Sequence, residues 1–159
     1  MVLKSADRKT VTSKSAPRLV LAFVMVLAGL GLVVFGLRGV LEEEVFVRTP
    51  NMLIRAKVAD DEAERTLGLS GRDGLDGNRA MLFIFDKPDI HSIWMKDMKF
   101  AIDIVWLDED KKVVSIDAGV KPDTYPKKFK PDTPSKYVVE FAEGRASELG
   151  IKVDQILSW

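Results

Sequence analysis

The chain has 159 residues, no cysteine, and equal numbers of basic and acidic residues, 24 of each. The lack of cysteine excludes disulfide bonds, thiolate metal sites and a cysteine nucleophile. Residues 1–18 hold five basic residues and one acidic residue (+4), whereas residues 38–159 hold 19 basic and 23 acidic residues (−4), and this acidic balance argues against nucleic-acid binding by the larger part.

Residues 19–37, from Leu19 to Leu37, form a run of 19 residues without a charge, flanked by Arg18 and Arg38. A helix of this length rises roughly 28 Å, which is close to the hydrocarbon thickness of a bilayer. We therefore expect a transmembrane helix that acts as an uncleaved signal anchor. Because basic flanks stay on the cytoplasmic side, we expect the tail of residues 1–18 inside and the following domain outside, in the cell envelope.

Two other interpretations of residues 19–37 stay open. The segment is also typical of a signal peptide, and cleavage after Ala28 would release a secreted or periplasmic protein, although the apolar run continues nine residues past Ala28. It is apolar on both faces, so a helix buried in a protein core is the third interpretation.

Residues 38–51 are expected to be a linker that contains the acidic residues 42–44 and a short first strand at 45–47. The alternation of apolar and basic residues at 52–58 predicts a half-buried strand. Acidic residues at 60–62 favour a helix start, so we expect a helix over 61–67 that ends at Gly68. Residues 70–79 form a glycine-containing loop without a phosphate-binding fingerprint.

Short apolar runs separated by polar breaks follow, which predicts further strands at residues 81–85, 90–95, 102–107, 113–116 and 137–141. Turns are expected at 86–89, around Pro88, and at 108–111. Residues 121–134 hold four prolines and predict a long loop, and residues 142–149 predict a short helix before a last strand at 155–159. The pattern indicates a mainly β (α+β) domain, a compact sandwich or barrel with short helices, over residues 52–159.

The stretch from Ala80 to Asp108 resembles the domain of unknown function 192 family, whose members are prokaryotic and often exported. The family motifs GMLF, WMKN-T and LD-(I/V) have counterparts at residues 81–83, 94–96 and 102–104. Residues 65–72 (RTLGLSGR) and 137–140 (YVVE) match further family segments, while Asp97 and Met98 replace the family's Asn and Thr. The resemblance implies a compact, mainly β domain with short helices, and it implies no activity.

Asp103 is the strongest candidate for a functional group. It lies in an expected strand that is apolar on both faces, so we expect its carboxylate to be at least partly buried. Such a group requires a cation, for which Lys96 and Arg72 are candidates, or several N–H donors. It either fixes the turn over residues 96–101 through backbone hydrogen bonds, or it binds a ligand or takes part in catalysis.

Trp94, Met95 and Lys96 form a second candidate cluster. Neighbouring strand residues point to opposite faces, so either both faces are covered or Trp94 forms the wall of a groove and offers its ring for stacking. Together with Arg72, these residues would form a ligand-binding groove beside the proline-rich loop. The single histidine, His91, belongs to no catalytic motif, and neither a metal nor a cofactor is predicted.

Two functions follow from these observations. The first is a non-catalytic module of the cell envelope that binds a small ligand or a partner and is held at the membrane by residues 19–37. The alternative is an acid–base enzyme that acts through Asp103 on an envelope polymer or metabolite. The enzyme requires Asp103 to open onto a pocket with a second titratable group nearby.

Overall fold

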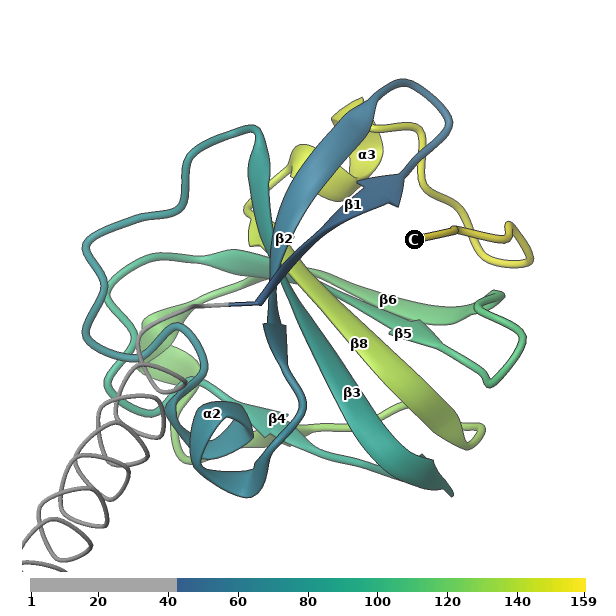
Figure 1. Ribbon diagram of the computed structural model, residues 1–159. Helices are drawn as coiled ribbons and strands as arrows, with labels where there is room; N and C mark the ends of the chain where they lie inside the picture. Colours follow the sequence, from purple (N-terminus) through teal and green to yellow (C-terminus); the bar gives the residue numbers. More distant parts are fainter. Residues whose placement is uncertain (1–42) are drawn as a thin grey trace, which may run out of the picture. The chain divides into compact units, whose positions relative to one another are not determined.

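A six-stranded sheet forms the centre of the domain in the computed structural model, which describes residues 43–159 (Figure 1). The spatial order of the strands is β1-β2-β3-β8-β5-β6. All neighbours in the sheet are antiparallel except β2 and β3, which are parallel. The strands are β1 (Glu44–Arg48), β2 (Leu53–Ala59), β3 (Arg79–Asp89), β5 (Ile102–Leu107), β6 (Val113–Val120) and β8 (Ser135–Ala142). The prediction of a mainly β domain with short helices is confirmed.

The connection between the parallel strands β2 and β3 contains the helix α2 (Glu62–Leu67). Asp61 caps its N-terminus, because one carboxylate oxygen accepts a hydrogen bond from the Glu64 N–H at 2.8 Å. Gly68 ends the helix at a positive φ of 50° and donates its N–H to the Glu64 carbonyl group. The predicted helix and its capping residues are therefore confirmed.

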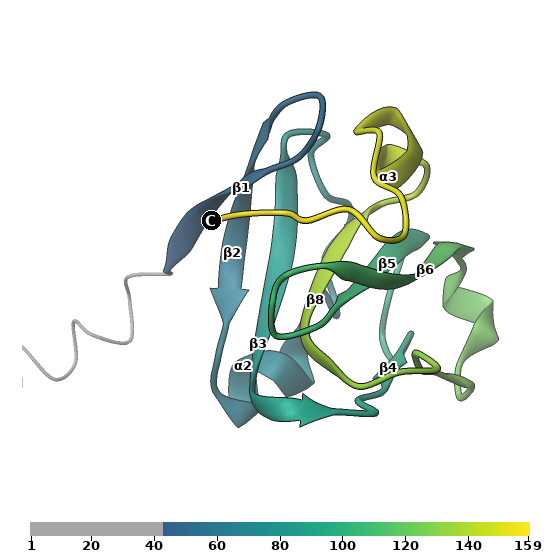
Figure 2. The same ribbon diagram turned by 90° about the vertical axis from the view of Figure 1, so that its right-hand side faces the viewer.

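The chain's last residues connect the two outer edges of the sheet. The Arg48 N–H on β1 donates to the Ser158 carbonyl group, and the Val113 N–H on β6 donates to the Gln155 carbonyl group, both at 2.8 Å. Figure 2 shows this segment passing from α3 (Arg145–Glu148) across β6 to β1. The predicted strand at 155–159 is present only as isolated bridges. The segment pairs with Arg48 at one edge of the sheet and with Lys112 near the other edge, so it forms a continuous ladder with neither.

Side chains on both faces of the sheet are buried, and they form two separate cores. The first core includes Ile54, Leu82, Val139 and Leu157 and lies beneath the C-terminal segment and α3. The second core, on the opposite face, includes Phe83, Ile104, Trp106 and Met95. All six residues of β5 are buried, which explains why this strand has no polar side in the sequence.

A small second sheet consists of β4 (Ile93–Trp94) and β7 (Lys128–Phe129), which are antiparallel. The expected loop over 121–134 therefore supplies a strand as well as a 3₁₀ turn, η1 (Pro122–Thr124). The pairing places the proline-rich segment next to Trp94, as the edge-on contact of Tyr125 with Trp94 also indicates.

Several boundaries predicted from the sequence are wrong. The expected strand at 90–95 is limited to Ile93–Trp94, and the expected strand at 113–116 continues to Val120. The expected turn at 86–89 belongs to β3, which continues to Asp89 with an irregular register before its pairing with Ser135; proline is tolerated at such a bulge. The expected helix at 142–149 is shortened to α3, because β8 extends to Ala142 opposite Ile102. Glu44 is not part of a solvated linker but starts β1, where its carboxylate pairs with Arg79 at 2.9 Å.

Within residues 43–159, no helix has the length and the apolar character that crossing a bilayer requires. The expected membrane anchor, residues 19–37, lies outside the described residues.

Candidate functional site

Glu140, on the central strand β8, places a carboxyl group in the middle of an apolar face. Val139 faces the first core, and its neighbours Val138 and Glu140 point to the other face of the sheet. Glu140 lies opposite Met81 on β3 and Ile104 on β5. Only 4% of the residue is exposed.

The Glu140 carboxyl group has no partner among residues 43–159: none of them forms a hydrogen bond or an ion pair with it. Burial raises the pKa of this carboxyl group from 4.5 to about 8, because desolvation penalises the charged form. At neutral pH the group is therefore mostly protonated. A buried polar group without a partner is costly, and this makes Glu140 the first candidate for a ligand contact.

A cavity of about 50 Å³ lies directly above this carboxyl group. Its walls combine apolar and polar groups and come from the loop after α2, from β3, β4 and β5, and from the turn before β5. They include Leu69, Phe83, Ile93, Met98 and Ile102. Three hydroxyl side chains, those of Thr66, Ser70 and Ser92, add polar atoms to the lining. The cavity has room for one or two small groups at most.

Two wider cavities continue from this one toward the surface. The first has a volume of about 270 Å³ and shares Arg65, Phe83 and Trp94 with the small cavity, and Lys128 borders it on the outside. The second, of about 650 Å³, runs along α2 to Lys96 and is the most open of the three. We call the three together the α2–β4 groove. We centre the site on the smallest of them, because it alone includes the buried carboxyl group.

Trp94 forms the outer wall of the groove, and 39% of it is exposed. The ammonium groups of Lys128 and Lys96 lie 5.5 and 5.8 Å from the centre of its rings. Met95, the next residue, is 1% exposed and belongs to the second core. Of the two interpretations of Trp94, the geometry favours the groove wall.

Arg65 closes the groove on the side of α2. Its guanidinium group donates hydrogen bonds to the carbonyl groups of Ile84, at 2.9 Å, and of Asp60. It also lies 5.5 Å from the centre of the Phe85 ring. The cation is therefore held in place by backbone oxygens and an aromatic ring.

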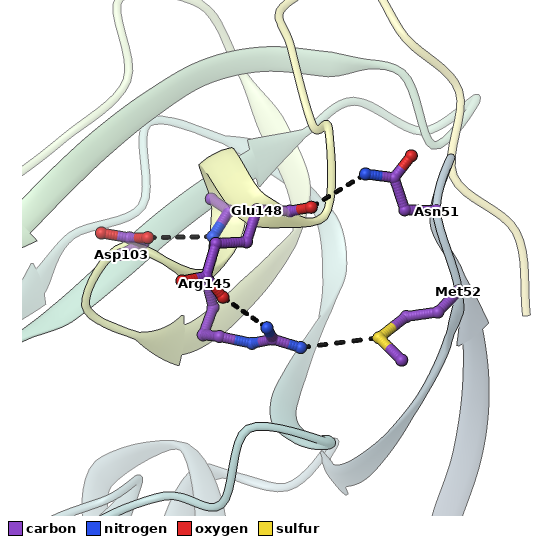
Figure 3. A network of polar contacts seen from close by, with 6 residues as sticks. Asn51, Met52, Asp103, Arg145 and Glu148 are labelled. Atoms are coloured by element: carbon purple, nitrogen blue, oxygen red, sulfur yellow. Dashed lines mark hydrogen bonds and ion pairs between the residues drawn. The ribbon is translucent and has the colours of Figure 1, made fainter.

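Asp103 lies on the opposite face of the sheet from Glu140, as the alternation along β5 shows. It is 1% exposed, and its two oxygens accept hydrogen bonds from the N–H groups of Gly119, at 2.8 Å, and Ala146, at 3.0 Å. Figure 3 shows how the second bond joins the Asp103 carboxylate to α3. Backbone donors, rather than Lys96 or Arg72, satisfy this carboxylate, and they connect β5 with β6 and α3 rather than fixing the turn over 96–101.

The remaining candidates are spread over the domain. The Lys96 carbonyl group accepts a hydrogen bond from Ser70 at 2.8 Å, and its side chain borders the widest part of the groove. Arg72 donates its backbone N–H to the Leu69 carbonyl group. His91 stacks on Phe85 with the ring centres 3.6 Å apart. In the part of the chain described by the structure, no three His, Cys, Asp or Glu side chains are grouped to hold a metal ion.

Sequence reasoning did not assign Glu140 to a site. The signal that could have found it is an ionisable residue inside the apolar run of residues 137–141. Asp103 also lies inside an apolar run, at residues 102–107. The two residues differ because backbone N–H groups donate hydrogen bonds to Asp103 and none donates to Glu140 among the described residues. The sequence does not show where such N–H groups lie.

Two solved structures are similar to this fold. A protein of unknown function from Novosphingobium aromaticivorans is 28% identical, with a TM-score of 0.68 over 73% of this chain and 85% of that one. A protein from Sinorhizobium meliloti, described as a proposed transcription regulator, is 22% identical, with a TM-score of 0.70 over 74% of this chain and 94% of that one. No curated protein matches the sequence. A family model, DUF192, described as an uncharacterized ACR, matches residues 45–159, and the chain therefore belongs to this family.

Proposed function

We propose that residues 43–159 form a small-ligand-binding module whose site is the α2–β4 groove. The observation that carries the proposal is the Glu140 carboxyl group, which is buried and unpartnered among the described residues and borders a cavity below an exposed tryptophan. A group of this kind lowers stability unless a partner satisfies it. Its position at the base of a groove supports a ligand as that partner.

The size and the lining of the groove support a small molecule. The cavity next to Trp94 measures about 270 Å³ and widens toward the outside. The aromatic ring of Trp94 offers a flat apolar face, and Thr66 and Ser92 offer hydroxyl groups for orientation. Pockets with apolar walls and a few polar groups are typical of small-molecule sites.

A thermal-shift screen of the full-length chain tests this function. The probes are small amines, amino acids, monosaccharides and divalent cations. We expect at least one probe class to raise the melting temperature, because a ligand at a hundred times its Kd stabilises the folded state by about 3 kcal/mol. The Trp94→Ala variant is expected to lose most of that shift.

Phe46→Ala is the matched control, because Phe46 is an exposed aromatic residue on β1, 60% exposed and outside the groove. It should keep the full shift. If no probe changes the melting temperature, or if Trp94→Ala responds as the unchanged chain does, the groove is not the binding site.

The alternative of an acid–base enzyme that uses Asp103 receives no support from the geometry of that residue. Both of its oxygens accept backbone hydrogen bonds, and only 1% of the residue is exposed. A base in this position cannot reach a substrate without breaking the bonds that connect β5 to α3 and β6.

We also propose that the module works outside the cytoplasm, tethered to the cytoplasmic membrane by residues 19–37 with the N-terminus inside. The uncharged run and the basic tail before it support this topology. The ligand would then be a component of the cell envelope. Secretion after signal cleavage is the alternative, and it places the module in the same compartment without the tether.

Alkaline phosphatase fused after Trp159 tests the location, because this enzyme is active only outside the cytoplasm. We expect activity in the membrane fraction, and a fusion that lacks residues 1–37 should be inactive. Activity in the soluble periplasmic fraction would indicate cleavage instead of an anchor. An inactive full-length fusion would contradict both versions.

A further inference from the structure

We propose that the α2–β4 groove binds a primary alkylammonium group, with the ammonium head paired to the Glu140 carboxylate and the alkyl stem packed between Phe83, Ile93 and Trp94. This inference rests on the proposed function and names the chemical class of its ligand. The source of the ammonium group can be a free amine or a lysine-type side chain, since the recognised chemistry is the same.

The base of the cavity determines the charge of the ligand. Among residues 43–159, Glu140 is the only acidic residue that borders the small cavity. A buried carboxylate becomes favourable when a cation and hydrogen-bond donors meet it, and an ammonium group supplies both in the smallest volume. The 50 Å³ of the cavity accommodate such a head and leave no room for a larger planar cation.

The walls of the cavity determine the rest of the ligand. The lining includes five large apolar side chains, those of Leu69, Phe83, Ile93, Met98 and Ile102, beside the polar groups of Arg65, Thr66, Ser70 and Ser92. An unbranched stem of methylene groups matches the lining and reaches the 270 Å³ cavity beside Trp94.

The other charged groups near Glu140 are cations, and each of them contacts groups other than Glu140. In the described part of the chain, Arg65 is the only other charged residue that borders the small cavity, and its guanidinium group donates hydrogen bonds to backbone carbonyl groups. The ammonium groups of Lys96 and Lys128 lie 5.8 and 5.5 Å from the centre of the Trp94 rings. The residues of β3 and β5 opposite Glu140, Met81 and Ile104, carry no charge.

Binding of this kind requires the carboxyl group to ionise. Since burial raises the pKa of Glu140 to about 8, the fraction available to an ammonium group grows about tenfold from pH 6 to pH 7 and levels off above pH 8. Alkylamines remain charged over this range. A neutral hydroxyl ligand would show the opposite trend, because it meets the protonated carboxyl group equally well up to pH 7 and loses that partner above pH 8.

The experiment is an equilibrium titration of the full-length chain with n-butylamine, n-butanol and sodium butyrate, which share one stem and differ in the head. Binding is followed by the amide NMR signals of Leu69 and Ile93 at pH 6, 7 and 8. Glu140→Gln keeps the shape of the side chain and removes its charge. Glu143→Gln, the same change at an exposed position three residues away, is the matched control.

We expect n-butylamine to bind at least tenfold more tightly than the alcohol or the carboxylate at pH 8. Its affinity should rise about tenfold from pH 6 to pH 7, Glu140→Gln should abolish this rise, and Glu143→Gln should preserve it. Equal binding of butanol and butylamine would overturn the ligand class while leaving the groove as a binding site. NMR shifts with n-butylamine that persist in Glu140→Gln would also overturn the ligand class, as would the absence of shifts with all three compounds. The thermal-shift screen with Trp94→Ala would then test the proposed function separately.

Discussion

Replacing Glu140 with glutamine is expected to stabilise the domain by roughly 3 kcal/mol at pH 7 and roughly 4 kcal/mol at pH 8. The pKa of this carboxyl group is about 8 in the folded chain, compared with 4.5 for an exposed glutamate. Between these two values the folded state holds a proton that the unfolded state has released. The free energy of unfolding therefore falls by about 1.4 kcal/mol for each unit of rising pH.

Glutamine carries no charge at any pH and has nearly the same shape as glutamate. The free energy of unfolding of the variant therefore lacks the fall with rising pH that Glu140 causes. Urea unfolding of both chains at pH 5, 7 and 8 measures the difference. It should be small at pH 5 and grow with pH, whereas Glu143→Gln should follow the unchanged chain throughout. If Glu140→Gln shows the same pH dependence as the unchanged chain, the carboxyl group is not desolvated as the structure indicates.

The same substitution separates function from folding. If the chain retains Glu140 for its ligand, the glutamine variant is more stable and binds less, which is the trade-off expected of a functional site. A variant that merely damaged the fold would lose both properties. The combination of a higher unfolding free energy with lost amine binding is therefore the result that connects the two experiments.

Replacing Asp103 with asparagine is expected to lower the free energy of unfolding by roughly 2–4 kcal/mol. The two carboxylate oxygens accept backbone hydrogen bonds from Gly119 and Ala146, and the site is 1% exposed. An amide offers one acceptor oxygen, and its NH₂ group would face the second N–H donor. One buried donor is then left unpaired, and water cannot reach it easily.

Asp108→Asn provides the comparison, because Asp108 also accepts two backbone N–H bonds, from Asp110 and Lys112, but accepts both with a single oxygen, Oδ1, in a half-buried turn. The amide oxygen of asparagine can accept both bonds, and we expect a change below about 1 kcal/mol. Chemical unfolding of both variants and of the unchanged chain at pH 7 measures the two changes in the free energy of unfolding. If Asp103→Asn proves as mild as Asp108→Asn, Asp103 does not have the structural role that its bonds indicate.

The local elements of this fold follow directly from the sequence. The helix α2 is predictable because Asp61 and Gly68 are capping residues on either side of a six-residue helix. The strand β2 is predictable because Ile54, Ala56 and Val58 are buried in alternation with Arg55 and Lys57. Each of these signals depends on contacts within a few residues, so the surrounding fold does not alter it.

Boundaries that depend on distant partners were not predictable. Pro88 marks a turn in most sequences, yet β3 continues past it, because β8 supplies a partner for Asp89. The C-terminal residues look like a strand, but they bridge β1 and β6 instead, since these edges come together only in the folded chain. Such pairings join residues far apart in the sequence, and no local pattern records them.

In the candidate site, too, local features were predictable from the sequence, and features that depend on distant residues were not. From the sequence alone we could determine that Trp94 and Met95 point in opposite directions and that Asp103 would be buried, because strand alternation and apolar neighbours are local facts. Only the tertiary structure decided that two backbone N–H groups satisfy Asp103, while Glu140, equally deep in the sheet, has none within reach among the described residues. The physical reason is that the cost of a buried carboxylate depends on which donors surround it, and three-dimensional packing brings those donors from other strands and from α3.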